Sequence, residues 1–108
     1  MKKDLMIGSL LDCYSPLLTE KQRYLLDCYY NEDLSLSEIA FNEGITPQGA
    51  RDIISRAAHR LCDYEQKLGL YKLLRQNQKA LSELSELADT TGGDIAAKLR
   101  AIVAEFYE

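Results

Sequence analysis

The sequence has no tryptophan, a single histidine and only three cysteines, and these shortages remove several classes of function. Cys13, Cys28 and Cys62 are far apart and form no Cys-x-x-Cys pair, so together with His59 they do not make a zinc-binding set. Each cysteine lies on an apolar stripe of a predicted helix, and we interpret all three as small buried apolar side chains. We therefore expect no metal and no cofactor.

Long hydrophobic runs are also missing. No stretch approaches the length of a membrane span. The N-terminal segment MKKDLMIGSLL resembles a signal peptide only faintly, because its apolar run is short and no small-x-small cleavage site follows it. We expect a cytoplasmic protein that does not insert into a membrane.

Positive charge is in deficit, since 13 Lys+Arg against 17 Asp+Glu give a net charge of -4. A protein that coats nucleic acid without specificity would be basic, so any nucleic-acid contact here must come from a local patch. The length of 108 residues suits one small compact unit, and a hydrophobic fraction of 46% is enough for a packed core.

The alternation of apolar and polar residues that is typical of strands is absent, and the sequence predicts an all-α fold of about six helices. The first is expected from about Asp4 to Tyr14, with Leu5, Met6, Leu10 and Cys13 on its inner side. Capping boxes at residues 19–22 and 35–38 open the second and third helices. Thr46 with Pro47 opens a long fourth helix, and Asp94 is expected to cap the last one.

Glycines and a change of composition divide the chain. Gly44 is expected to end the third helix and Gly69 the fourth. We expect a helix-turn-helix bundle over residues 1–69 and a C-terminal helical hairpin over residues 70–108, which packs on the bundle or on a partner chain. The hairpin begins with a heptad-like seam, a candidate for homodimerisation, made of Leu70, Leu74, Asn77, Leu81 and Leu84. Alternatively, this seam packs against the chain's own Phe106 face.

The spacing of small and apolar residues indicates a helix-turn-helix. Ala40 is the expected contact between its two helices, Gly44 forms the turn and Ile45 follows it. Ala50 and Ile53 are expected to pack inward from the second helix. A plain helical hairpin is the alternative.

The exposed residues of that second helix are candidates for contact with nucleic acid, because its N-terminal part enters the major groove in such motifs. Gln48 could address adenine and Arg51 guanine, whereas Asp52 would be repelled by phosphates. Residues 51–79 carry seven basic and three acidic side chains, a net charge of +4 that leaves -8 on the rest. This asymmetry indicates a polyanion-binding face, with ordinary solvated helix faces as the alternative. The candidate residues are Gln48, Arg51, Ser55, Arg56, Arg60, Lys67, Lys72 and Arg75.

Four segments carry a resemblance to a known family: LLT-x-KQ at 17–22, YY-x-(E/D)DLS at 29–35, SEIA at 37–40 and YE-x-KL at 64–68. Together they resemble the YlxM family of small bacterial proteins over nearly the whole chain, and the same core is similar to region 4 of sigma-70 factors. The resemblance implies a sigma region 4-like helix-turn-helix, grouped with winged-helix-like domains, and no catalytic residues. It also implies a role beside the signal recognition particle protein Ffh or its receptor FtsY, because members are usually encoded next to them.

The chain departs from that family at the start of the second helix, where Thr46-Pro47-Gln48-Gly49 stands in place of the usual Ser-Arg-Gln-Ala. The departure argues against sequence-specific reading of DNA and leaves the fold unchanged. No paired carboxylates, phosphate-cradling loop or nucleophile elbow is present, so we expect neither an enzyme nor a small-molecule substrate.

Three functions remain open after the sequence analysis. The first is a nucleic-acid-binding regulator or adaptor of the signal recognition particle pathway, with DNA, the particle's RNA, Ffh or FtsY as partner. The second is a protein-interaction module that uses the helix-turn-helix as a scaffold. The third is a transcription regulator unrelated to protein targeting.

Overall fold

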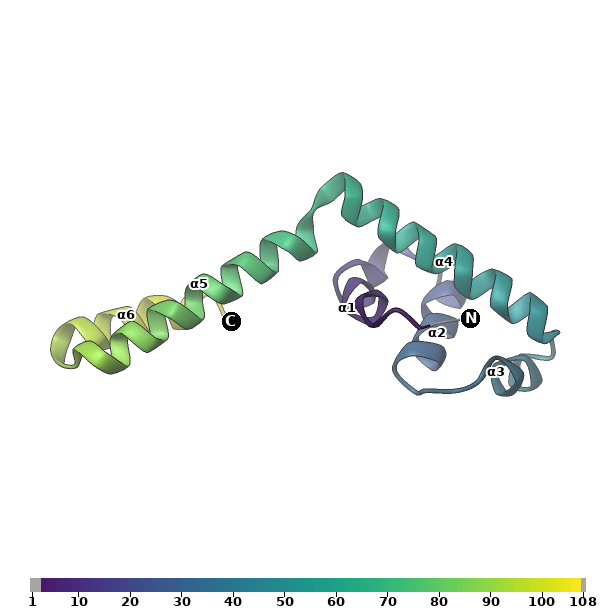
Figure 1. Cartoon of the computed structure of the whole chain (residues 1–108), viewed down its shortest axis with the longest axis horizontal. Coiled ribbons are helices and arrows are strands. Elements are labelled where there is room, and N and C mark those ends of the chain that lie inside the picture. Colours follow the sequence, from purple (N-terminus) through teal and green to yellow (C-terminus); the bar gives the residue numbers. More distant parts are fainter. Residues whose placement is uncertain (1–2, 108) are drawn as a thin grey trace. The chain divides into compact units, whose positions relative to one another are not determined.

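A computed structural model describes residues 3–107, and this part of the chain is helical with no strand (Figure 1). The helices are α1 (Leu5–Tyr14), α2 (Glu20–Tyr30), α3 (Leu36–Glu43), α4 (Pro47–Leu68), α5 (Leu70–Thr91) and α6 (Gly93–Glu105), and a short 3-10 turn, η1 (Ser15–Leu17), joins the first two. The prediction of an all-α fold is confirmed. The chain divides into two compact units, and the second begins at Lys72 in the first turn of α5.

The helix starts follow the capping signals of the sequence. The Thr19 and Ser35 side chains accept hydrogen bonds from the backbone N–H groups of Gln22 and Glu38. The Gln22 and Glu38 side chains accept from the N–H groups of Thr19 and Ser35 in return, which completes two capping boxes. Thr46 caps α4 in front of Pro47, as predicted. The cap predicted at Asp94 is wrong, because α6 already begins at Gly93 and places Asp94 in its first turn.

The first unit is built around α4, which packs against α1, α2 and α3 (Figure 1). Its apolar stripe recurs every three to four residues and is fully buried at Ala50, Ile54, Ala57 and Leu61. The other helices contribute the remaining core side chains: Ile7, Leu10, Leu11, Tyr14, Leu18, Leu25, Leu26, Cys28, Tyr29, Ile39 and Ala40.

The inner face predicted for α1 is wrong at Leu5 and Met6, whereas Leu10 is buried and Cys13 half-buried as expected. Leu5 and Met6 are exposed, by 86% and 49%, whereas the buried side chains start at Ile7 and continue at Leu10, Leu11 and Tyr14. The Asp4 carboxylate caps the helix by accepting a hydrogen bond from the backbone N–H of Met6. Leu5 and Met6 therefore belong to the first turn and face outward, because the buried stripe follows the three-and-four spacing from Ile7.

The cysteines differ in burial, which corrects the prediction that all three are buried. Cys28 is buried, Cys13 is half-buried and Cys62 is exposed. Cys62 follows the fully buried Leu61 on α4, and one residue turns the helix by about 100°, so its side chain lies outside the apolar stripe.

The break between α4 and α5 is held by a hydrogen-bond network that starts from α1. Gly69 adopts the left-handed conformation, with φ of 63°, and ends α4. The buried Tyr14 hydroxyl donates to Glu65 Oε1 at 2.6 Å and accepts from the backbone N–H of Leu70 at 3.0 Å. The same Glu65 oxygen accepts from the N–H of Tyr71 at 3.0 Å. These two side chains thus cap the first turn of α5.

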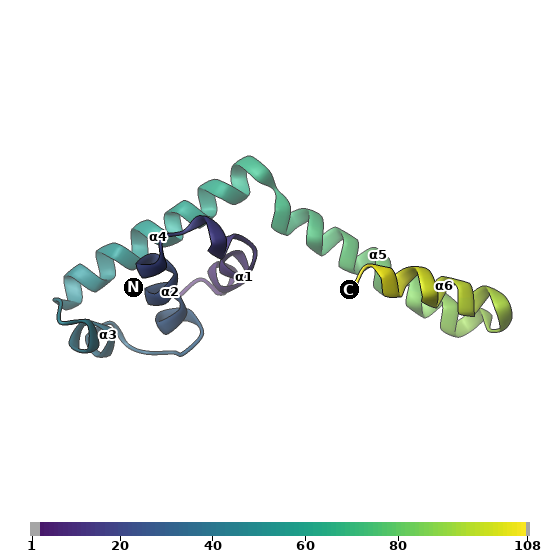
Figure 2. The same ribbon diagram turned by 180° about the vertical axis from the view of Figure 1, so that it is seen from behind.

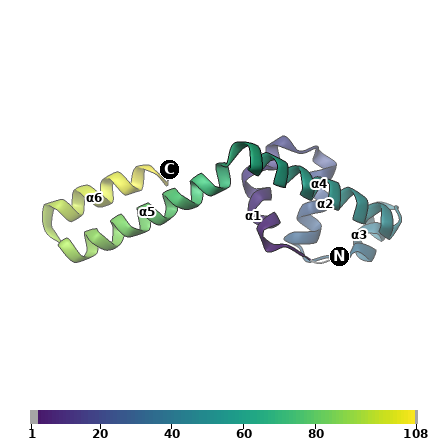
Figure 3. The same ribbon diagram turned by 45° about the horizontal axis from the view of Figure 1, so that its top comes forward.

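In the second unit α6 folds back along α5, which all three views show (Figures 1–3). Gly92 and Gly93 make the turn in the left-handed region, with φ of 69° at each. Leu81 and Ala88 of α5 and Ala96 and Val103 of α6 are the buried side chains of this hairpin. Arg100 Nη2 donates to Asp89 Oδ1 at 2.7 Å across it.

Candidate nucleic-acid interface

The helix-turn-helix comprises α3, the turn at residues 44–46 and α4. Gly44 has φ of 67°, in the left-handed region that a turn of this kind requires. The backbone N–H of Ile45 donates to the carbonyl of Ala40 at 3.0 Å. Ala40 and Ala50 are both buried where the two helices meet, and Ile53 is half-buried against the core. All five positions thus play the parts predicted from their spacing.

The outer face of α4 presents the predicted contact residues to solvent. Gln48, Arg51, Ser55, Arg56 and Arg60 are all exposed, as is Lys67 in the last turn. Side chains at these positions project from the face opposite the apolar stripe, so none of them contributes to the core.

A hydrogen bond joins Gln48 to Asp52 at the centre of this face. Gln48 Nε2 donates to Asp52 Oδ1 at 2.9 Å, one helical turn further on. This contact uses an amide donor that adenine readout needs, and it keeps a carboxylate beside the expected path of a phosphate backbone. The i,i+4 spacing could have revealed the pair in the sequence.

The basic residues of α4 do not form one patch. Arg56, Arg60 and Lys67 follow one another at spacings of four and seven, so they line one edge of the exposed face. Arg51 lies on the other edge, about 140° from Arg56 around the helix axis. No ion pair is recorded within residues 3–107 for Arg56, Arg60 or Lys67. We call these three residues the basic edge.

A histidine and an aspartate also lie on the exposed face of α4. His59 Nε2 lies 3.8 Å from Asp63 Oδ2, which pairs them whenever the imidazole is protonated. Of the remaining predicted contact residues, Lys72 and Arg75 are exposed on α5 in the second unit. The basic edge therefore consists of residues of α4 alone.

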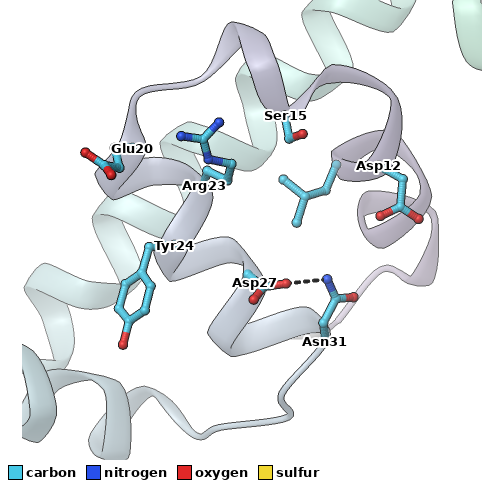
Figure 4. Close-up of a pocket in the computed structure, with 8 residues that line it drawn as sticks. Asp12, Ser15, Glu20, Arg23, Tyr24, Asp27 and Asn31 are labelled. Atoms are coloured by element: carbon cyan, nitrogen blue, oxygen red, sulfur yellow. Dashed lines mark hydrogen bonds between the residues drawn. The ribbon is translucent and has the colours of Figure 1, made fainter.

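A shallow groove on α1, η1 and α2 carries the opposite charge. Its lining contains three carboxylates and one guanidinium, and Asn31 Nδ2 donates to Asp27 Oδ1 at 2.7 Å (Figure 4). A net negative groove repels phosphates, so it does not extend the basic edge. The lining residues are Leu11, Asp12, Ser15, Glu20, Arg23, Tyr24, Asp27 and Asn31.

The titratable side chains of the described residues show no arrangement for metal binding. Residues 3–107 contain no group of three or more His, Cys, Asp or Glu side chains that could hold a metal ion. Partial desolvation by neighbouring side chains raises the pKa of the exposed Cys62 thiol above its ordinary value, and the nearby Asp4 and Asp63 carboxylates add to the shift. The thiol therefore stays protonated near neutral pH, which lowers its reactivity.

Comparison with known proteins assigns the family. The sequence profile of the family UPF0122, described as "Putative helix-turn-helix protein, YlxM / p13 like", matches residues 1–99. The chain belongs to the UPF0122 family. The resemblance to YlxM seen in the sequence is thereby confirmed.

Several UPF0122 proteins are similar to the chain over most of their length. One from Symbiobacterium thermophilum is 40% identical over 104 residues, which cover 96% of this chain and 95% of the relative. One from Desulforamulus reducens is 44% identical over 82% of this chain and 76% of its own. One from Fusobacterium nucleatum is 44% identical over 74% of this chain and 78% of its own.

The seam predicted for dimerisation divides between two environments. Leu81 is buried inside the α5–α6 hairpin and Leu84 is half-buried, whereas Leu70, Leu74 and Asn77 are exposed.

No helix among residues 3–107 is long and apolar enough to span a membrane.

Proposed function

We propose that this UPF0122 protein is a nucleic-acid-binding regulator or adaptor of the bacterial signal recognition particle pathway. The observation that carries the binding proposal is the basic edge. In a chain with a net charge of -4, three cations stand on one edge of the second helix of a helix-turn-helix and are paired with no carboxylate among residues 3–107. The link to the pathway rests on the resemblance to YlxM proteins.

The proposed mode of binding is contact with phosphates along one edge of α4. Arg56 and Arg60 lie one turn apart and Lys67 two turns further on, so their cations can follow a nucleic-acid backbone. Gln48 Nε2 donates a hydrogen bond to Asp52 at 2.9 Å. On the opposite edge of the exposed face of α4, Arg51 is the single basic residue. This arrangement favours recognition of backbone shape over reading of base edges, which suits a structured RNA such as that of the particle.

A salt titration tests this proposal. Binding of the intact protein to the particle's RNA and to duplex DNA from its own operon is measured by fluorescence anisotropy as salt is raised. With about three phosphate contacts, we expect the logarithm of the affinity to fall with that of the salt concentration with a slope of about -2 to -3. Absence of binding to both ligands at low salt would exclude the proposal.

Asp52 and Phe41 favour a second candidate, a protein-interaction module. Asp52 places a carboxylate at the centre of the exposed face of α4, and the aromatic ring of Phe41 on α3 is 87% exposed. Exposed aromatic side chains of this kind are enriched in protein interfaces. Capture of Ffh or FtsY by the intact protein, resistant to both high salt and nuclease, would favour this candidate over the first.

A further inference from the structure

The α5–α6 hairpin leaves apolar side chains of both helices uncovered. Leu73 and Leu87 of α5, Ile95 and Ile102 of α6, and Phe106 directly after α6 each expose more than half of their surface. We call these five residues the open face. They outnumber the four side chains, Leu81, Ala88, Ala96 and Val103, that the hairpin buries between its helices.

The ion pair between Asp89 and Arg100 places the uncovered residues on a single side of the hairpin. Leu87 and Asp89 flank the buried Ala88, each turned from it by about 100° in opposite directions. Asp89 reaches Arg100 at 2.7 Å across the hairpin, so Leu87 points to the other side. On α6, Ile102 lies about 160° around the axis from Arg100 and thus points to the same side as Leu87.

Helical spacing extends this side along both helices. Leu73 is two heptads before Leu87, and Ile95 of α6 is seven residues before Ile102. Phe106, the C-cap of α6, is four residues after Ile102 and keeps a helical backbone conformation. The open face therefore lies on one side of α5 and α6, while the ion pair occupies the reverse side. Its five side chains are apolar, and the exposed Glu83 and Lys98, one helical turn from Leu87 and Ile102, border it.

The composition of the second unit indicates what covers the open face. The unit spans Lys72–Glu108, fewer than 40 residues, and helical units this small usually need a disulfide, a metal or association for stability. Its sequence has no cysteine and no histidine, which leaves no side chain for a disulfide and none of the usual nitrogen or sulfur ligands for a metal. Association with another chain is the remaining means of stabilising the unit. A second copy of the protein is the one partner that is always present with it.

The area and charge of the open face fit such a partner. Five large side chains that are more than half exposed offer roughly 500 Å² per copy, so two copies bury about 1,000 Å², at the lower end of specific interfaces. An apolar face is also complementary to itself in a two-fold contact. The charged residues that border the open face, Glu83 and Lys98, are of opposite sign. We propose that two copies of the protein associate through the open faces of their α5–α6 hairpins and form an antiparallel four-helix bundle.

This proposal differs from the seam expected from the sequence and is independent of nucleic-acid binding. Leu81 belongs to the hairpin interior and not to the contact between copies. Leu87 and Ile102, which the seam does not include, are central to the contact instead.

The mass of the intact protein in solution tests the dimer. Sedimentation equilibrium at micromolar concentration is expected to give twice the chain mass of 12.3 kDa. Leu87→Glu and Ile102→Glu are expected to sediment at the single-chain mass, because a carboxylate in the contact would be buried without a partner. Both side chains are more than half exposed within one copy, so neither substitution places a charge in the interior of the hairpin.

Ala97→Glu is the matched control, since it places the same charge on the exposed, ion-pair side of α6. We expect it to remain a dimer. The midpoint temperature of unfolding should fall on dilution for the parent and for Ala97→Glu, and not for Ile102→Glu. A single-chain mass for the parent, a dimer that persists in both open-face variants, or dissociation of the control as well would each overturn the proposal.

Discussion

At the scale of single residues, the exposed face of α4 combines groups that favour and groups that oppose contact with phosphates. Arg56, Arg60 and Lys67 line one edge, and Asp52 stands at the centre with its carboxylate hydrogen-bonded by Gln48. Because Asp52 is exposed, its charge acts on any phosphate that approaches the face. If α4 binds phosphates as proposed, the charge of Asp52 is thus expected to weaken that contact.

Asp52→Asn is expected to tighten nucleic-acid binding at low salt. The change removes a negative charge while the amide oxygen still accepts the hydrogen bond from Gln48. We expect the affinity to rise about fivefold, equivalent to roughly 1 kcal/mol, in anisotropy titrations. Asp12→Asn, which removes the same charge from the acidic groove, is the control, and an equal gain in both variants would refute a local role for Asp52.

Gly49→Ala is expected to stabilise the protein. A Cβ atom at position 49 would lie 3.1 Å from Thr46 Oγ1, which is a close contact. The two capping boxes, at Thr19 and Ser35, accommodate side chains at the same third position, Gln22 and Glu38. The gain in helix propensity should therefore prevail and raise the free energy of unfolding by about 0.5–1 kcal/mol, measured by chemical denaturation. A free energy of unfolding below that of the parent would show that the Thr46 side chain cannot move to accommodate the Cβ atom.

At the scale of helices, the junction between α4 and α5 is the feature that local sequence signals explain least. Gly69 predicts that α4 ends, and the structure confirms it. The groups that cap the start of α5 are Tyr14 and Glu65, which are 51 residues apart in the sequence. A contact of that separation arises only when α1 packs on α4, so no spacing rule reveals it.

Tyr14→Phe is expected to destabilise the first unit. The change removes the hydrogen bond to Glu65 and leaves the N–H of Leu70 without its acceptor. We expect the free energy of unfolding to fall by about 1–2 kcal/mol in urea denaturation. Tyr24→Phe is the control because that ring is 52% exposed, and an equal loss in both variants would contradict a specific role for the junction.

The same variant is expected to change the response to alkali. Burial, followed by the hydrogen bond to Glu65, raises the pKa of Tyr14 above its ordinary value of 10.0. The folded protein thus holds this proton more tightly than the unfolded chain, so the contribution is complete below pH 10.0 and is lost as the pH rises further. Tyr14→Phe should lose less stability than the parent over that alkaline range.

At the scale of the whole molecule, local sequence signals predict where the helices begin and end better than they predict which side chains are buried. The capping residues Thr19, Ser35 and Thr46 act over three residues, and these predictions are confirmed. The outward position of Leu5 and Cys62 depends on which helices pack on α1 and α4, and the sequence pattern misassigned both. Where apolar residues are present on more than one side of a helix, tertiary packing decides which side is buried.

The candidate site shows the same division. The helix-turn-helix and the exposure of its contact residues follow from spacing alone, because a turn glycine and a buried alanine are local requirements. The separation of Arg51 from the basic edge follows from helical geometry. Counting the charges over residues 51–79 did not reveal it, because a net charge does not say on which side of a helix each residue lies. The role of the site in binding stays a prediction.

The central claim is that the basic edge of α4 binds a nucleic-acid backbone, and a comparison of two charge reversals tests it most directly. Arg60→Glu removes a cation from the basic edge, and Lys21→Glu makes the same change at an exposed position of α2. Titrations of the particle's RNA over a range of salt concentrations should show that Arg60→Glu weakens binding and reduces the salt slope by about 1, whereas Lys21→Glu leaves the slope unchanged. Equal effects of the two substitutions would contradict the claim.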